Sequence, residues 1–190
     1  MAESNSNPSI QGSRSDTARS LTDDEYRALY SDENQERQQI SPFKQNQFEK
    51  NAQKYWDQFY KRNTSNFFKD RHWTLREFQI ETNETKTLFE VGCGVGNFLF
   101  PLLTELPNLF IHACDFSTTA INLLHQNPQY NADRLHSFVC DLTDENEIPL
   151  EQNSIDICSM IFVLSAINPD KMAQVLQKLH RVKTIFFSLI

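Results

Sequence analysis

Glycine is scarce in this chain of 190 residues. Four glycines occur in all, and three of them, Gly92, Gly94 and Gly96, stand close together. Glycine is the residue used where the backbone must take a positive φ or come very near a ligand. The cluster therefore predicts a functional turn, and the rest of the chain has no second glycine-rich candidate.

The chain also lacks the features of several other protein classes. It contains no C-x-x-C pair, which argues against a zinc site and indicates free, buried thiols in a reducing compartment. The four cysteines are Cys93, Cys114, Cys140 and Cys158. No apolar run approaches the roughly 18 residues of a membrane span, and the polar N-terminus has no signal-peptide core. We therefore expect a cytoplasmic or nuclear protein with no membrane and no metal partner.

An excess of positive charge is missing too, since the net charge is −7. This argues against a uniformly basic nucleic-acid-binding protein. The charge is uneven, because residues 43–80 carry eight bases and four acids, whereas residues 1–42 carry eight acids and four bases. Such a basic stretch is typical of a polyanion-binding face or of an ordinary solvated helix surface, and charge alone leaves both open.

Composition divides the chain into three segments. Residues 1–42 are predicted to be an acidic tail, disordered at first and then partly helical from Leu21 to Ile40. Residues 43–80 form an aromatic and basic helical segment, in which Trp56 and Tyr60 lie four residues apart and share one helix face. These aromatics could equally be a helix face docked on a core. A further helix is expected at 75–78, and residues 81–190 are predicted to form a partial Rossmann-like domain.

The glycine cluster has a short apolar strand before it and an apolar helix after it, which predicts a nucleotide-type cradle. The spacing differs from the dinucleotide pattern G-x-G-x-x-G, because Asn97 stands where the third glycine belongs. Glu90, two residues before Gly92, would repel a pyrophosphate and suits a cation or an ammonium group. The pattern favours S-adenosylmethionine over a dinucleotide, and a plain glycine-rich turn is the alternative.

The remaining sequence alternates strands and helices, which predicts a parallel sheet with helices on both faces. The predicted elements are strands at 88–91, 109–114, 137–140, 155–164 and 183–190, and helices at 97–103, 118–126 and 169–182. Ser117 and Asn168 are expected to cap two of the helices. Asp115 and Asp141 follow strands, at the edge where such sheets bind ligands. The last helix is expected to bury Met172, Val175, Leu176, Leu179 and Val182.

Three blocks together resemble the tRNA 3-methylcytidine methyltransferases, which are class I Rossmann-like enzymes. They are residues 51–63, the sequence Asn-Phe-Phe-Lys-Asp-Arg-His-Trp at 66–73, and Glu-Val-Gly-Cys-Gly-Val-Gly-Asn at 90–97. Phe-Tyr-Lys-Arg-Asn within the first block is similar to the member that acts on serine tRNAs. The resemblance implies an S-adenosylmethionine-dependent enzyme that forms 3-methylcytidine in a tRNA anticodon loop. It also implies serine tRNA as partner and, with it, seryl-tRNA synthetase.

The resemblance and the glycine pattern together give the candidate site residues. The cofactor-binding candidates are Trp56, Tyr60, Glu90, Gly92, Gly94, Gly96, Asp115, Asp141, Leu142 and Ile161. The candidates for binding tRNA are Lys61, Arg62, Lys69, Arg71 and His72. No catalytic residue stands out, and none is expected to hold a metal.

The C-terminal residues depart from the family pattern. Family members continue with a Lys-Pro-Gly turn and further strands, whereas this chain has Arg-Val-Lys-Thr-Ile-Phe-Phe from Arg181 and then ends. We therefore expect a C-terminally truncated sheet and a poor catalyst. The alternatives are an inactive fragment that binds cofactor or a partner, and a methyltransferase that acts on small molecules.

Overall fold

The computed structural model describes residues 40–65, 67–71 and 85–189. Residues 45–190 form one compact unit. The helices expected at 21–40 and 75–78 and the tRNA-binding candidate His72 lie outside the described residues. The division of the chain at residues 42 and 80 stays a prediction.

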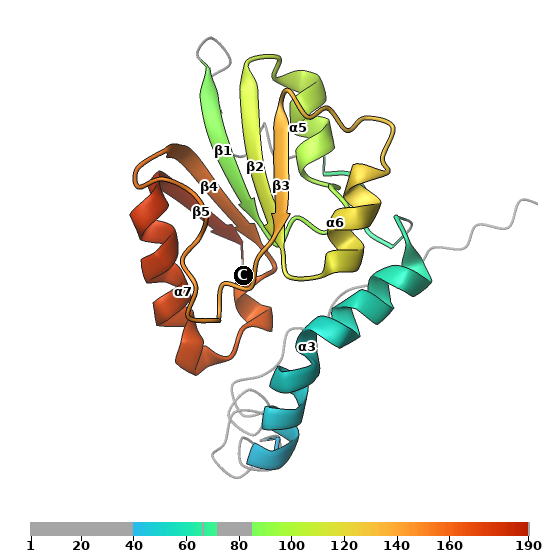
Figure 1. The fold of residues 1–190 in the computed structure, drawn as a ribbon, viewed down its shortest axis with the longest axis vertical. Helices are drawn as coiled ribbons and strands as arrows, with labels where there is room; N and C mark the ends of the chain where they lie inside the picture. The colour runs from blue at the N-terminus through green and yellow to red at the C-terminus, as the bar shows by residue number, and fades with distance from the viewer. Residues whose placement is uncertain (1–39, 66, 72–84, 190) are drawn as a thin grey trace, which may run out of the picture. The chain divides into compact units, whose positions relative to one another are not determined.

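A five-stranded parallel sheet forms the centre of the larger unit, with strand order β3-β2-β1-β4-β5 (Figure 1). The strands are β1 (Lys86–Val91), β2 (Leu109–Asp115), β3 (Leu135–Val139), β4 (Ile155–Ile161) and β5 (Lys183–Leu189). Strands that follow each other in the sequence are joined by a helix or a long loop, as parallel pairing requires. The predicted α/β class with a parallel Rossmann-like sheet is confirmed.

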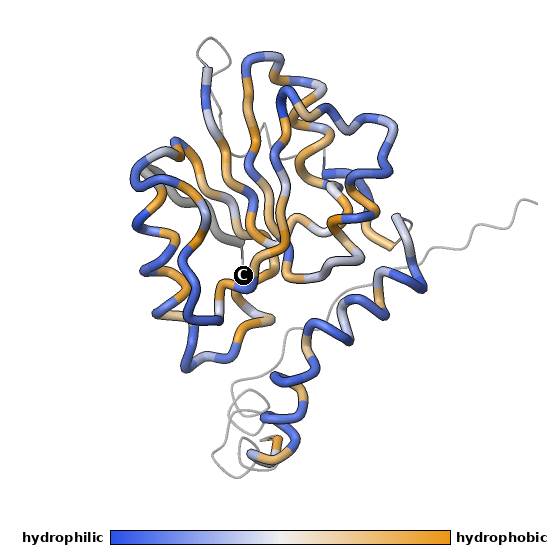
Figure 2. Tube along the Cα trace, viewed as in Figure 1, coloured by the Kyte–Doolittle hydropathy of each residue, from blue (hydrophilic) through white to orange (hydrophobic). Residues whose placement is uncertain are grey.

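Helices cover both faces of the sheet. Helices α5 (Leu99–Glu105) and α6 (Thr118–His125) lie on one face, and α7 (Pro169–Val182) lies on the other (Figure 1). The adjacent residues Leu88 and Phe89 of β1 are both fully buried, one in each core. A strand buried on both faces carries apolar residues on both, and Figure 2 shows orange stretches, interrupted by blue, along the strands of the sheet.

The predicted helix caps are confirmed. The Ser117 hydroxyl accepts a hydrogen bond from the Ala120 amide at 3.1 Å, at the start of α6. The Asn168 side-chain oxygen accepts one from the Asp170 amide at 3.1 Å, with Pro169 at the first position of α7. Both satisfy amides that have no partner within the helix.

Two details of the prediction are wrong, and Met172, which was expected in the core, is only half-buried. Leu176 was expected in the core but is 38% exposed, because the buried stripe of α7 runs through Val175, Lys178, Leu179 and Val182, at the spacing of one helical face. Lys178 takes part in that stripe because its ammonium donates to the Asp144 and Asn146 carbonyls. The strand expected at 155–164 ends instead at Ile161 and gives way to a short 3-10 helix, η1 (Leu164–Ala166).

The described ranges also bear on membranes and metals. Within them, no helix combines the length and the apolar character that crossing a membrane requires. No group of three or more metal-ligating side chains gathers in residues 40–65, 67–71 and 85–189. All four cysteines are free, and three of them, Cys93, Cys114 and Cys158, are buried as predicted, whereas Cys140 is half-buried.

Candidate functional site

A cavity of about 650 Å³ lies at the carboxyl ends of the strands. Nine of the ten cofactor-binding candidates line it: Trp56, Tyr60, Glu90, Gly92, Gly94, Asp115, Asp141, Leu142 and Ile161. The tenth, Gly96, belongs to the turn but not to the cavity wall. A Cβ on Gly96 would lie 2.4 Å from the Phe100 ring, so this glycine serves the packing of α5. Parallel sheets bind ligands at this edge, and the strand order changes direction at β1.

The glycine turn is kept bare by its neighbours. Gly92 and Gly94 have φ of +66° and +54°, a region that other residues rarely occupy. A Cβ would lie 2.3 Å from Val163 Cγ2 at Gly92, and 2.7 Å from the Tyr60 hydroxyl at Gly94. The turn therefore has both the backbone conformation and the close approach for which the sequence predicted glycine.

Asp115 ties the end of β2 to the glycine turn. Its Oδ2 accepts a hydrogen bond from the Gly94 amide at 2.9 Å, and its Oδ1 accepts one from the Ser117 amide at 2.8 Å. Burial raises the pKa of the carboxyl to about 6, although these hydrogen bonds act in the opposite direction. Each carboxylate oxygen has a second lone pair, so Asp115 can still accept hydrogen bonds from a ligand in the cavity.

Glu90 is the most unusual polar group of the cavity wall. The side chain is buried, and Oε2 has no hydrogen-bond partner among the described residues. Burial raises the pKa of this carboxyl well above its usual range. A buried acceptor without a partner is costly, and a cationic ligand would satisfy it. The site therefore fits a ligand that has an ammonium group, which agrees with the cofactor predicted from the sequence.

The helix α3 (Pro42–Asn63) supplies the aromatic wall of the cavity. The rings of Trp56 and Tyr60 stack with centroids 6.0 Å apart, as predicted from their spacing. Tyr60 is buried against Val95 and Ala120. Burial raises the pKa of the Tyr60 phenol, which therefore stays protonated and can donate a hydrogen bond.

The C-terminal half of α3 is hydrogen-bonded to the start of α6. The Asp57 carboxylate accepts hydrogen bonds from the Ser117 hydroxyl at 2.6 Å and from the Thr119 amide at 3.0 Å. Burial alone would raise the pKa of Asp57, but these bonds outweigh it and hold the pKa below its usual range. The Gln53 amide adds a bond to the Phe116 carbonyl at 2.6 Å.

One turn earlier in the helix, Glu49 binds the start of α7. It forms an ion pair with Lys171 and accepts a hydrogen bond from Asn168 at 3.1 Å. Helix α3 therefore bridges the N-termini of α6 and α7, which lie on opposite faces of the sheet. These polar contacts could not be predicted from the sequence, because the residues that make them lie 60 or more positions apart and leave no local pattern.

Asn97 connects the glycine turn to residues 67–71, Phe-Phe-Lys-Asp-Arg. Its side-chain amide donates to the Phe68 carbonyl at 3.0 Å and to the Asp70 carboxylate at 3.1 Å. Its own carbonyl accepts from the Arg71 amide at 2.8 Å. The residue that breaks the dinucleotide pattern thus has a structural task, since glycine could not make the two side-chain bonds.

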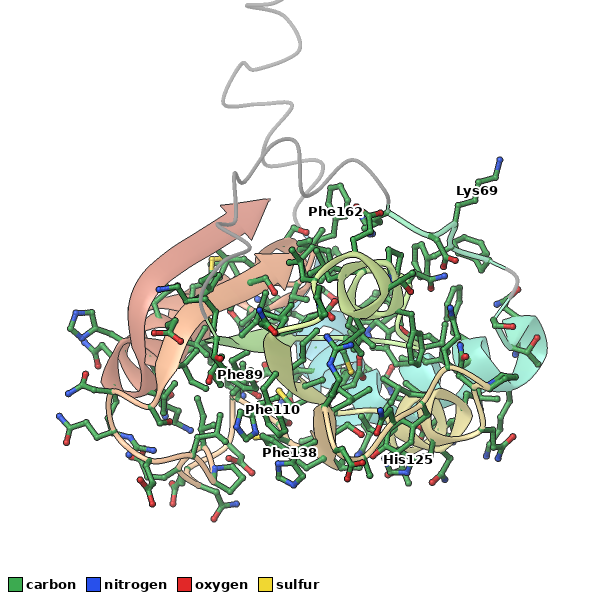
Figure 3. The ribbon with its side chains drawn as sticks, turned by 90° about the horizontal axis from the view of Figure 1, so that it is seen from above. Lys69, Phe89, Phe110, His125, Phe138 and Phe162 are labelled. Carbon is green, nitrogen blue, oxygen red and sulfur yellow. The ribbon has the colours of Figure 1, made fainter. Side chains whose placement is uncertain are left out.

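The described tRNA-binding candidates divide into two groups. Lys61 and Arg62 are exposed in the last turn of α3, and Lys69 is also exposed, pointing away from the protein in Figure 3. Arg71 instead lines the cavity, and its guanidinium carbon lies 5.1 Å from the centroid of the Phe162 ring. The structure therefore brings Arg71 to the site and leaves the three other cations on the surface.

Comparison with known proteins agrees with the fold and the site. A family model described as a methyltransferase domain matches residues 89–184. Among solved structures, geranyl diphosphate C-methyltransferase from Streptomyces coelicolor is similar with a TM-score of 0.51 and 12% identity, covering 62% of this chain and 43% of that one. The fold and the domain are those of the S-adenosylmethionine-dependent class I methyltransferases.

The chain belongs to this methyltransferase family, and its curated relatives agree with the resemblance predicted from the motifs. Human tRNA N(3)-cytidine methyltransferase METTL6 is 51% identical in an alignment 174 residues long that covers 87% of this chain and 59% of the relative. The tRNA N(3)-methylcytidine methyltransferase trm141 of Schizosaccharomyces pombe is 43% identical over 148 residues, 75% of this chain and 60% of the relative. The chain thus spans about three fifths of the length of these relatives.

Proposed function

We propose that this chain is an S-adenosylmethionine-dependent methyltransferase that acts on N3 of a cytidine in tRNA. The observation that carries the proposal is the cavity at the strand ends, where a buried Glu90 oxygen has no hydrogen-bond partner within residues 40–65, 67–71 and 85–189 and where Gly92 and Gly94 carry no side chains. The curated relatives, named as tRNA cytidine methyltransferases, support the choice of substrate.

In this proposal each part of the cavity wall holds one part of the cofactor. The Glu90 carboxylate pairs with the ammonium group, and Asp115 accepts hydrogen bonds from the ribose hydroxyls. Asp141 and Leu142, which follow β3, lie at the adenine. Trp56 and Tyr60 close the aromatic side, and Ile161 adds an apolar contact at the end of β4. When bound, S-adenosylmethionine supplies a methyl group that its sulfonium has already activated.

The chemistry asks little of the protein beyond positioning. N3 of cytosine has an in-plane lone pair, so no side chain needs to remove a proton to create the nucleophile. What the chain must do is hold the base in line with the methyl group and exclude water, and orientation of this kind can supply most of the acceleration. The carboxylates of the cavity wall, Glu90, Asp115 and Asp141, are therefore free to bind the cofactor and need not remove a proton from the base.

The RNA would be held by the basic residues beside the cavity. Arg71 reaches the cavity itself, and Lys61, Arg62 and Lys69 are exposed and available to phosphates. A cytidine in a loop is easier to extract than one in a duplex, which favours the anticodon loop as the target. Serine tRNA, and with it seryl-tRNA synthetase as a partner, follows from the motif Phe-Tyr-Lys-Arg-Asn at 59–63. Four free cysteines suit the cytoplasm or the nucleus.

The decisive experiment incubates the 190-residue chain with labelled S-adenosylmethionine and unmodified tRNA transcripts, and then identifies the methylated nucleoside by mass spectrometry. We expect slow formation of 3-methylcytidine in serine tRNA, in keeping with the poor catalysis expected from the sequence, and none in a transcript whose loop cytidine is replaced by uridine. Transfer to a small molecule but not to RNA would favour the small-molecule alternative. Cofactor binding without any transfer would favour the inactive fragment.

A salt titration tests the RNA surface separately. If Lys61, Arg62 and Lys69 contact phosphates, the tRNA association constant should fall steeply with salt, with a slope that decreases by about 0.7–0.9 for each contact removed. Reversing the charge of Lys61 and Lys69 together should weaken tRNA binding and leave cofactor binding unchanged. Equal tRNA affinity in the folded double variant would assign these residues to an ordinary solvated surface.

A further inference from the structure

The backbone of Phe162 takes a conformation that phenylalanine rarely adopts. Three described residues other than glycine have positive φ, namely Thr64, Asn153 and Phe162, with φ of 50°, 55° and 57°. Thr64 directly follows α3, and its amide donates to the Tyr60 carbonyl at 2.8 Å as in a helix C-cap. Asn153 is an asparagine, which tolerates this region well. Phe162 has neither explanation. A bulky residue held at positive φ is strained, and such residues cluster at functional sites.

The strained residue Phe162 has its side chain outside the core. Its side chain is 56% exposed and lines the rim of the cavity, although it directly follows β4. The next residue, Val163, packs closely enough on Gly92 to exclude a Cβ there. The backbone turn therefore sends the valine inward and the aromatic ring outward. In Figure 3, Phe162 lies on the same side of the molecule as Lys69, and Phe110 and Phe138 lie on the opposite side.

A guanidinium is already stacked against this ring. The Arg71 guanidinium carbon lies 5.1 Å from the ring centroid, and the Arg71 amide is tied to the glycine turn through Asn97. An aromatic ring beside a cation is the combination that binds single-stranded nucleic acid, because the ring stacks on a base and the cation meets a phosphate. Because Phe162 is exposed even with Arg71 beside it, part of its surface remains accessible to a flat ligand.

We propose that Phe162 is the side chain on which the target cytosine stacks when the base enters the cavity. This inference rests on the proposed function, since it assumes an RNA substrate. Phe162 is then a positioning residue, which holds the plane of the base at the rim of the cofactor cavity. Neither the sequence motifs nor the residue type indicates this role. The evidence for it is the positive φ of Phe162 and the exposure of its ring.

The test uses three variants of the full chain. Phe162→Tyr keeps the ring, Phe162→Leu removes it, and Phe162→Asn removes it and also relieves the backbone strain. The probe is an RNA stem-loop that carries a fluorescent cytosine analogue at the target position, since stacking on an aromatic ring quenches such an analogue. The matched control is Phe110→Leu, which alters an aromatic side chain that does not line the cavity.

We expect quenching with the parent chain, with Phe162→Tyr and with Phe110→Leu, and its loss with Phe162→Leu and Phe162→Asn. Methyl transfer to the unlabelled stem-loop should fall about 5- to 150-fold in the last two variants, which is the range for one lost base stack. S-adenosylhomocysteine affinity should stay within about twofold of the parent. The melting temperature of Phe162→Asn should equal or exceed that of the parent, which a merely structural role for the ring would not produce.

The outcomes separate this inference from the proposed function. If the parent chain methylates the stem-loop and Phe162→Leu does so equally well, the stacking role is wrong and the proposed function stands. If the parent chain binds S-adenosylhomocysteine but neither quenches the analogue nor methylates the RNA, the proposed function fails and the stacking role fails with it. Loss of folding in Phe162→Asn but not in Phe162→Leu would overturn the assignment of strain.

Discussion

Replacing Asp115 by asparagine should separate cofactor binding from folding. In the folded chain the carboxylate accepts two backbone N–H bonds, at 2.8 and 2.9 Å, from Ser117 and Gly94. Asparagine has one acceptor oxygen, so one of these amides loses its partner and the charged acceptor for the ribose disappears. A hydrogen bond to a charged group contributes about 1.5–3 kcal/mol. The dissociation constant for S-adenosylhomocysteine should therefore rise about 10- to 150-fold.

The same substitution should cost little stability. Burial raises the pKa of Asp115 from 3.8 to about 6, so the ionised form is disfavoured in the folded chain by about 2 pKa units, or about 3 kcal/mol. Asparagine carries no charge and escapes this cost. It leaves one buried donor unsatisfied, at about 1–3 kcal/mol. The two effects nearly cancel, so the free energy of unfolding at pH 7 should stay within about 2 kcal/mol of the parent.

Titration calorimetry with S-adenosylhomocysteine and urea unfolding measure the two quantities. The matched control is Asp156→Asn, because Asp156 accepts a 2.7 Å hydrogen bond from the Thr87 amide at the opposite end of the same sheet. This control should lower stability and leave the affinity unchanged. Unaltered affinity in a folded Asp115→Asn chain would refute the ribose assignment. A large loss of stability would instead show that the carboxylate serves chiefly to hold the glycine turn.

Three further predictions follow from the same geometry. Gly94→Ala should bring a methyl group within 2.7 Å of the Tyr60 hydroxyl at a positive φ, so calorimetry should detect no cofactor binding and the melting temperature should fall. Glu49→Lys and Lys171→Glu should each speed cofactor release in stopped-flow experiments, and combining them should restore the slow rate if their ion pair holds α3 over the cavity. Cofactor affinity should fall as the pH drops through about 6, because protonation removes the Asp115 acceptor. The cofactor-free chain should gain stability from that group over the same interval, since the folded state then binds the proton more tightly; a flat affinity profile would contradict this.

Local signals explain why much of the site could be predicted from the sequence. The glycines, Glu90 and Asp115 stand at fixed distances from strand ends, and a parallel sheet brings all its carboxyl ends to one edge. The caps at Ser117 and Asn168 are equally local, since each acts within three residues. For such features, the number of residues between the two groups determines whether they come into contact.

Other parts depend on contacts that no spacing encodes. In the sequence, Asp57 and Glu49 are simply two acids on a predicted helix. Their hydrogen bonds to the starts of α6 and α7 are seen only in the folded chain. The positive φ of Phe162 stands next to a second contact of this kind, the packing of Val163 on Gly92 in the glycine turn after β1. Leu176 was assigned to the core because it is apolar. Its actual exposure follows from the rotation of α7 on the sheet, which favours the stem of Lys178 instead.

The cysteines give this cavity a built-in chemical reporter. Cys93, Cys114 and Cys140 all line it, each beside the end of a different strand. The hydrogen bond from the Cys114 thiol lowers the pKa of Cys140 and raises that of Cys114, whereas burial raises the pKa of Cys93. Because the thiolate is the form that reacts, an alkylating reagent should mark Cys140 first. A ligand that fills the cavity would shield that sulfur and lower the fraction of Cys140 that is alkylated. Mass spectrometry of the alkylated chain can therefore measure how much of the cavity is occupied, without a labelled cofactor or a catalytic assay.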